Sequence, residues 1–141
     1  MVDQQVIGKR LEKMEQSLRK IDRFKHLTWE EFNQDDLVQD VVEYNLLIAI
    51  NLMVDIAAHV VVDAKMGVPD TLAESFHFLY QNKHISEEQY QLFRRMTAFR
   101  NKLTHEYLTI DTKVVYRIMQ DHIQDFRQFI LLIHDKFFEK E

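Results

Sequence analysis

Turn-forming residues are almost absent from this sequence. Its 141 residues include two glycines and one proline, whereas the tight turns of β-hairpins depend on such residues. This scarcity argues against an all-β fold and favours helices joined by short connections. The chain also has no cysteine, which excludes disulfides and thiolate metal sites and fits a reducing compartment.

Four long segments carry apolar residues at helical spacing and are predicted to be the main helices. They cover residues 3–25, 36–66, 86–105 and 111–137. In the first, the stripe predicted to face the core is Val6, Leu11, Met14, Leu18 and Ile21. In the third it is Leu92, Met96, Phe99 and Leu103, and in the fourth it is Val115, Ile118, Ile123, Phe126, Phe129, Ile130, Ile133 and Phe137. We therefore predict an all-α fold, an up-and-down four-helix bundle that spans residues 1–141 as one domain.

Short polar motifs predict where several of these helices begin. Residue pairs with the spacing of a capping box are Thr28 with Glu31, Thr71 with Glu74, and Ser86 with Gln89, and Asp111 can cap the last helix. The first two pairs predict additional short helices over residues 28–33 and 71–82. Gly67 and Pro69 predict the end of the helix over residues 36–66.

The segment over residues 36–66 is the most apolar part of the chain. Apolar residues cover more than one of its faces, so we expect one face in the bundle core and another against a second subunit, in a homodimer. Its longest apolar run is interrupted by Asn51, Asp55 and His59, which favours a buried helix over a membrane span. The first residues lack the plan of a signal peptide. We therefore expect a soluble, cytoplasmic protein without a membrane partner.

The charges are unevenly distributed. The formal net charge is −5, which argues against a protein that coats nucleic acid by bulk electrostatics. Residues 94–105 nevertheless contain no acid and four cations, Arg94, Arg95, Arg100 and Lys102. Such a run is either a solvated helix face or a local basic cleft. A basic cleft on an acidic body would suit a small substrate footprint.

Arg100 and His105 together offer the chemistry of phosphodiester cleavage without a metal. Arginine is a permanent cation whose planar fork of donors suits phosphate oxygens, and histidine exchanges protons near neutral pH. On an uninterrupted helix, residues five apart point roughly 140° away from each other. The two side chains converge only if the helix ends between them or if a second subunit supplies half of the site. The alternative is two exposed cations that complement the dipole at a helix C-terminus.

Other patterns for catalysis or cofactor binding are weak. Glu74 and His77 have the spacing of one di-iron ligand pair, but the further ligands of such a site are missing. The two glycines, Gly8 and Gly67, cannot form a Gly-rich phosphate loop. We expect neither a metal nor a cofactor.

The motif around Arg100 resembles the signature of a known family. The segment reads Arg100-Asn101-x-x-x-His105-x-Tyr107 and is reached through residues 96–99. It is similar to the motif of HEPN-domain RNase toxins, most closely the HepT group. The similarity extends over most of the chain and includes residues 44–50, the break at Val68 and Pro69, the following Phe76 and Leu79, and residues 110–116.

The resemblance implies an activity and a substrate. Members of this group act as metal-independent endoribonuclease toxins on RNA. On this reading His105 takes the proton from a ribose 2′-hydroxyl or delivers one to the leaving oxygen, and Arg100 stabilises charge on the phosphate. Residues expected to help position the RNA are Asn101, Lys102 and Arg95. The alternative function is a catalytically silent HEPN module that binds nucleotide or serves as the partner of a nucleotidyltransferase.

The resemblance also implies a partner, a cognate minimal nucleotidyltransferase antitoxin. In the family this enzyme attaches AMP to the tyrosine at the position of Tyr107, which would add phosphate charge beside Arg100. Judged by residue type alone, Tyr107 fits an amphipathic side chain that closes the end of the bundle. The sequence departs from the family pattern at Thr104, where an aliphatic residue is usual, and at Ala98, where glycine is frequent. Neither change removes a catalytic group.

Overall fold

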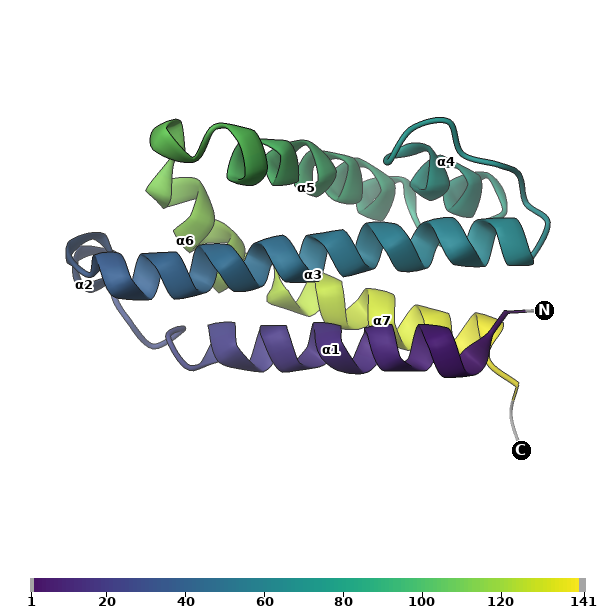
Figure 1. Ribbon diagram of the computed structural model, residues 1–141, viewed down its shortest axis with the longest axis horizontal. Helices are drawn as coiled ribbons and strands as arrows, with labels where there is room; N and C mark the ends of the chain where they lie inside the picture. Colours follow the sequence, from purple (N-terminus) through teal and green to yellow (C-terminus); the bar gives the residue numbers. More distant parts are fainter. Residues whose placement is uncertain (1, 140–141) are drawn as a thin grey trace.

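The fold is a bundle of helices. The computed structural model describes residues 2–139, and the side chain of Tyr107 lies outside that description. Within the described residues the chain forms seven α-helices and one short 3-10 helix, and no strand. In chain order they are α1 Gln4–Asp22, α2 Trp29–Gln34, α3 Asp36–Asp63, α4 Glu74–Gln81, α5 Glu87–His105, η1 Tyr107–Thr109, α6 Thr112–Asp121 and α7 Ile123–Phe137. The arms α1, α3, α5 and α6–α7 run alternately up and down (Figure 1), which confirms the predicted architecture.

The short helices α2 and α4 lie at opposite ends of the bundle (Figure 1). At the α2 end, the Tyr116 hydroxyl on α6 donates a 2.7 Å hydrogen bond to the Leu27 carbonyl, and its ring packs against Trp29 and Phe32. Aromatic rings also join α4, α5 and α7. Phe76, Phe93 and Phe129 are fully buried, with ring centroids 5.3 to 6.4 Å apart. Through Phe93, these rings hold α5 against α4 and α7.

The buried face of α1 differs by one residue from the prediction. Leu11, Met14, Leu18 and Ile21 are buried as expected, but Ile7 takes the place that was predicted for Val6. Ile7 lies one helical turn before Leu11 and so continues the same stripe. Val6 is turned about 100° away from it and is 38 % exposed. The helix is also shorter than predicted, because the chain leaves it after Asp22.

Two of the three predicted capping boxes are confirmed. Thr28 with Glu31 and Ser86 with Gln89 each form both reciprocal hydrogen bonds, and the bonds from Thr28 lower the pKa of the Glu31 carboxyl. The predicted box at Thr71 is wrong. Helix α4 begins at Glu74, and the Glu74 carboxylate instead accepts a 3.1 Å bond from the Asp70 N–H. Asp111 caps α6 as predicted.

The long helix α3 ends before the residue that was predicted to stop it. Lys65 adopts a left-handed conformation with φ 59°, and the N–H of Met66 bonds back to the carbonyl of Val61 at 2.9 Å. This pattern satisfies the last carbonyls of a helix without a glycine. Gly67, with φ +151°, serves the connection instead, because a Cβ there would lie 2.6 Å from the Phe78 ring.

The fourth arm was predicted as one helix and is two. Helix α6 ends and α7 begins at His122, whose φ of −121° and ψ of 4° are not helical. The His122 ring bonds to Asp125 in the first turn of α7, Nδ1 to Oδ2 at 3.0 Å. The buried faces of α6 and α7 largely match the prediction, although Ile130 and Phe137 are only partly buried. In α5, the buried face is centred on Phe93, Met96 and Leu103, and the predicted Leu92 and Phe99 flank it half-buried.

Helix α3 is the central element of the bundle. It is the single helix in the described part of the chain whose length and apolar composition would let it cross a membrane. Buried helices of globular domains meet the same criterion, and 56 % of its most apolar window is buried inside the protein. Most of its remaining exposed residues share one face, since they are three, four, seven or eight positions apart. They include Leu37, Val41, Tyr44, Asn51, His59 and Val62.

Candidate functional site

Arg100 is held from two sides by neutral amides. It projects half-buried from the last third of α5. Its Nε donates a 2.7 Å hydrogen bond to Oδ1 of Asn51 on α3, and its Nη1 donates a 2.9 Å bond to Oδ1 of Asn101. No ion pair to Arg100 exists among residues 2–139. The guanidinium is therefore fixed in position while its positive charge stays available to an anion.

Asn51 is the contact of the candidate site that the sequence did not reveal. Its side chain lies 49 residues before Arg100 along the chain. The sequence marked it only as a polar interruption in an apolar run. Such an interruption on an otherwise apolar helix is a usable signal, because a polar side chain there needs a partner.

Helix α5 does not end between Arg100 and His105. It runs through His105, and the N–H of the following Glu106 bonds to the Lys102 carbonyl at 2.9 Å. The two side chains therefore leave the helix about 140° apart and about 7.5 Å apart along its axis. The sequence allowed the two side chains to converge either through a helix end between them or through a second subunit. The first of these predictions is wrong, because α5 is continuous from Arg100 to His105.

His105 occupies the last turn of α5 and is exposed. Among the described residues its side chain has no hydrogen-bond or ion-pair partner, and Lys102 nearby is likewise exposed. An unpaired imidazole at a helix end is accessible to an external proton donor or acceptor. Arg100 and His105 thus flank α5 on different sides, one facing α3 and one facing solvent.

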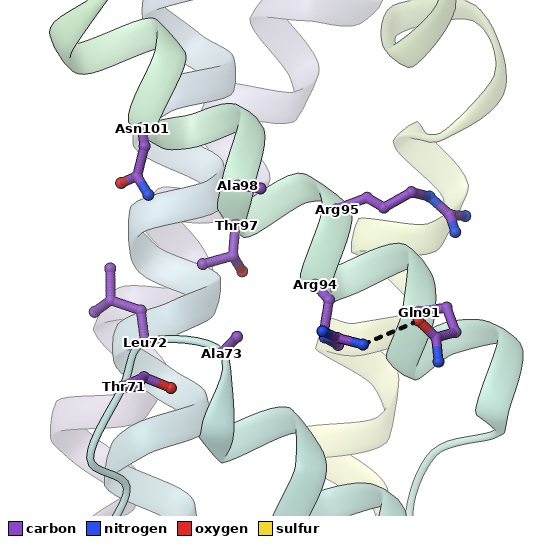
Figure 2. A pocket seen from close by; sticks show the side chains of 9 residues that line it. All are labelled: Thr71, Leu72, Ala73, Gln91, Arg94, Arg95, Thr97, Ala98 and Asn101. Atoms are coloured by element: carbon purple, nitrogen blue, oxygen red, sulfur yellow. Dashed lines mark hydrogen bonds between the residues drawn. The ribbon is translucent and has the colours of Figure 1, made fainter.

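Asn101 lines a broad hollow between α5 and residues 71–73, with a volume of about 620 Å³. Figure 2 shows its amide beside this hollow, with Thr97, Ala98 and Arg94 on the following turns toward the N-terminus of α5. Arg94 is engaged there, because it bonds to Gln91 at 3.2 Å and lies over the Tyr90 ring.

Arg95 lines the same hollow as Asn101 but lies on a different face of α5. In Figure 2 its side chain extends away from Thr97 and Asn101. The two residues are six positions apart, which places them about 120° from each other around the helix. Arg95 also lines two further hollows that border α6 and α7. The predicted RNA-positioning residues therefore lie along α5 on different faces.

Tyr107 begins the short helix η1 directly after α5 ends. Its side chain lies outside the described residues, so the structure leaves its predicted role as AMP acceptor untested. The neighbouring Glu106 and Leu108 are exposed, Leu108 to 89 %. The backbone of this segment is therefore at the surface, two residues beyond His105.

The residues considered for a metal have other contacts. Glu74 binds the Asp70 N–H, and the His77 ring packs against Phe78 and Tyr90. In the part of the chain that the structure describes, no group of three His, Asp or Glu side chains could hold a metal ion.

Comparisons with known proteins agree on one family. The family model described as "Ribonuclease HepT-like" matches residues 14–133. The chain is 33 % identical to the mRNA nuclease HepT of Shewanella oneidensis over 103 residues, which cover 73 % of this chain and 77 % of that protein.

Solved structures extend the match to the fold. The tri-AMPylated HEPN toxin of Shewanella oneidensis, in complex with MNT antitoxin, superposes with a TM-score of 0.86 at 28 % identity, covering 96 % of this chain and all of that one. A toxin–antitoxin structure with AMP-PNP gives a TM-score of 0.82 at 28 % identity, covering 94 % and 99 % of the two chains. These matches confirm the resemblance carried by the Arg100 motif, and the chain belongs to the ribonuclease HepT-like family.

Proposed function

We propose that this protein is a metal-independent endoribonuclease that acts in the cytoplasm as the toxin of a toxin–antitoxin pair. The observation that carries the proposal is the state of Arg100, which two amides hold in place without neutralising its charge. The exposed His105 follows on the same helix. The relative named mRNA nuclease HepT supports RNA as the substrate.

The proposed chemistry needs these two side chains, solvent water and the RNA itself. The 2′-oxygen of a ribose attacks the adjacent phosphorus and forms a cyclic phosphate as the bond to the leaving 5′-oxygen breaks. His105 takes the 2′-hydroxyl proton or gives a proton to the leaving oxygen, and solvent water makes the other of these two proton transfers. Arg100 stabilises the negative charge that grows on the phosphate oxygens. Because the nucleophile is the 2′-hydroxyl, DNA would not be cleaved.

The active site is proposed to form between two protomers. Arg100 and His105 diverge on the continuous helix α5, so a second copy of the chain is required to bring an arginine and a histidine to one phosphate. The exposed face of α3 is suited to this contact, because it carries the apolar Leu37, Val41 and Tyr44. Asn51, the partner of Arg100, lies on the same face. Dimerisation there would bring each Arg100 close to the subunit interface, and a monomer of 17.1 kDa in light scattering would contradict it.

The antitoxin is proposed to be a minimal nucleotidyltransferase that transfers AMP to Tyr107. Support comes from the related toxin that is tri-AMPylated and bound to MNT antitoxin, and from the surface position of the η1 backbone. The added phosphate would pair with Arg100 and block RNA from it. The Tyr107→Phe variant should keep RNase activity but gain no AMP by mass spectrometry after incubation with the cognate enzyme and ATP. The same adduct on this variant would reassign the acceptor.

Cleavage of a labelled single-stranded RNA tests the ribonuclease itself. Wild-type protein should cut it in the presence of EDTA and leave cyclic phosphate ends, whereas His105→Ala should be inactive with an unchanged helical circular dichroism spectrum. His26→Ala removes an exposed histidine that lies 79 residues before His105 in the sequence. It is the matched control and should retain activity. Full activity of purified His105→Ala would overturn the catalytic assignment.

A further inference from the structure

A small pocket lies between α5 and α6, apart from Arg100 and His105. Its volume is about 230 Å³. The side chains that form its walls are apolar and come from both helices: Leu92, Met96, Phe99, Val114 and Ile118. A space of this size is smaller than the usual pocket for a drug-sized ligand, which is about 300 to 1,000 Å³. It suits one flat, largely apolar group.

The rim of the pocket is cationic. Arg95 from α5 and Arg117 from α6 line it, together with His122 at the break before α7. Both arginines are exposed, and neither has an ion-pair partner in the described part of the chain. The 3.0 Å hydrogen bond between His122 Nδ1 and the accepting Asp125 carboxylate fixes the orientation of the His122 ring. An apolar slot under unpaired arginines fits a ligand that joins a planar group to a phosphate.

Basic side chains on the surface of α5 link the pocket to the proposed catalytic histidine, His105. Arg95, Lys102 and His105 follow one another along the exposed side of α5, over about 15 Å of helix axis, with no acid between them. In the opposite direction, beyond Arg95 and His122, the next hollow is lined by Glu88 and Asp125. The favourable path for an anionic strand therefore runs from the pocket toward His105.

We propose that this α5–α6 pocket binds one unpaired base of the RNA substrate, while Arg95 and Arg117 hold the phosphates beside it. The inference rests on the proposed ribonuclease function and adds a subsite to it. Single-stranded RNA is recognised through bases that leave the stack and lie against aromatic rings or arginine planes. Phe99 offers such a surface here. The cationic path that joins the pocket to His105 favours an RNA strand over an acidic peptide of the antitoxin.

Binding measurements with two RNAs test the subsite. The protein carries His105→Ala so that RNA stays intact, and Kd is measured by fluorescence anisotropy for a short single-stranded RNA and for the same RNA with abasic residues. Loss of the bases should weaken binding by roughly tenfold. Val114→Phe fills the pocket, so it should weaken binding of the intact RNA and remove most of the difference between the two RNAs. Val68→Phe, an equal change at an exposed loop residue, should keep the full difference.

A second variant tests the rim and does not depend on packing. Arg117→Ala should weaken both RNAs alike and reduce the salt dependence of binding, because it removes a phosphate contact. Arg23→Ala, an exposed arginine after α1, is the control and should do neither. Circular dichroism of each variant reports folding, and Arg117→Ala carries the test if Val114→Phe is misfolded.

Several results would overturn the subsite. One is an unchanged abasic penalty in folded Val114→Phe, and another is equal RNA binding by Arg117→Ala and Arg23→Ala. Loss of antitoxin binding in Val114→Phe with normal RNA binding would assign the pocket to the protein partner instead. Cleavage by the wild-type protein separates this failure from that of the proposed function. If Val114→Phe cuts RNA normally, only the subsite proposal is refuted. If the wild-type protein does not cut RNA, both the subsite and the proposed ribonuclease function are refuted.

Discussion

Two arginines of this bundle, Arg127 and Arg100, are held in opposite ways. Arg127 on α7 bonds to two carboxylates of α1, to Asp22 at 2.6 Å and to Glu15 at 3.1 Å. Arg100 on α5 bonds to the amides of Asn51 and Asn101 at similar distances. Both side chains are half-buried and fixed by two partners. Only Arg127 has its charge neutralised.

The difference separates an arginine inside an ion-pair network from one whose partners leave its charge uncompensated. Burial by itself lowers the pKa of Arg127, but the hydrogen bonds and charges of Asp22 and Glu15 outweigh it and raise that pKa above its ordinary value. The ion-pair network thus ties α7 to α1. At Arg100, neutral acceptors fix the geometry without competing with a phosphate for the charge. The two arginines therefore differ in the chemistry of their partners, which are amides at Arg100 and carboxylates at Arg127.

The largest expected effect is on catalysis by Arg100. Arg100→Ala should lower kcat/KM for RNA by roughly 10²- to 10³-fold, because one stabiliser of transition-state charge is lost. Its melting temperature should stay near that of wild type, since no carboxylate is left unpaired. Arg100→Lys should restore only part of the rate, because lysine cannot bond to both amides and keep a planar fork for phosphate. Single-turnover cleavage measures the rate, and thermal denaturation measures the melting temperature. A normal cleavage rate for Arg100→Ala would refute the catalytic role proposed for Arg100.

Asn51→Asp converts the surroundings of Arg100 toward those of Arg127. The new carboxylate should pair with the guanidinium and lower RNA cleavage by about tenfold, because phosphate must compete for the charge. Asn51→Ala leaves the charge of Arg100 unpaired but removes one of its two hydrogen bonds. The cleavage rate at saturating RNA should therefore fall less in Asn51→Ala than in Asn51→Asp. Asn33→Asp, at an exposed position in α2, controls for the added negative charge. Equal rates for Asn51→Asp and Asn33→Asp would show that neutral partners do not matter.

Arg127→Ala should produce the reverse phenotype. Glu15 and Asp22 would lose their shared partner, and the bundle should be destabilised by about 1–3 kcal/mol. RNA cleavage per folded molecule should remain near wild type. Urea denaturation gives the free energy of unfolding, and Arg23→Ala provides an exposed control. A stability equal to that of Arg23→Ala would mean that the network contributes nothing.

The smallest expected effect is the pH dependence of stability near neutrality, which comes from His84. Burial first, and Lys136 second, lower the pKa of His84. The unfolded chain therefore binds a proton more readily than the folded one. This contribution to stability is present above the ordinary histidine pKa of about 6.5 and is lost as the pH falls below it toward the lowered pKa. The melting temperature of His84→Gln should fall less than that of wild type between these pH values, and parallel curves would contradict the assignment.

Local features of the sequence predicted local structure well. The capping boxes at Thr28 and Ser86 formed because both partners lie within one turn, and they need no distant contact. The box at Thr71 has the same spacing but failed, since residues 72 and 73 form a turn, α4 begins only at Glu74, and the Glu74 carboxylate bonds to the Asp70 N–H instead. The break at His122 had no glycine or proline to announce it. Pattern alone therefore gave the helices but not every boundary.

The candidate site was predicted by residue type and resemblance, but its geometry was not. Arg100 and His105 were identified from the sequence, and the continuity of α5 between them required the structure. The bond from Arg100 to Asn51 depends on how α5 packs against α3, which no short motif encodes. The separation of Arg95 from Asn101 follows from the same continuity.

The central claim is that an arginine of one protomer and a histidine of the other act on the same phosphate. It is tested by refolding Arg100→Ala and His105→Ala proteins together, each inactive by itself, and measuring RNA cleavage by the mixture. A mixed dimer has one complete site, so random pairing should restore about a quarter of the wild-type activity. No activity above that of the separate variants, in a mixture that demonstrably contains mixed dimers, would contradict the shared site.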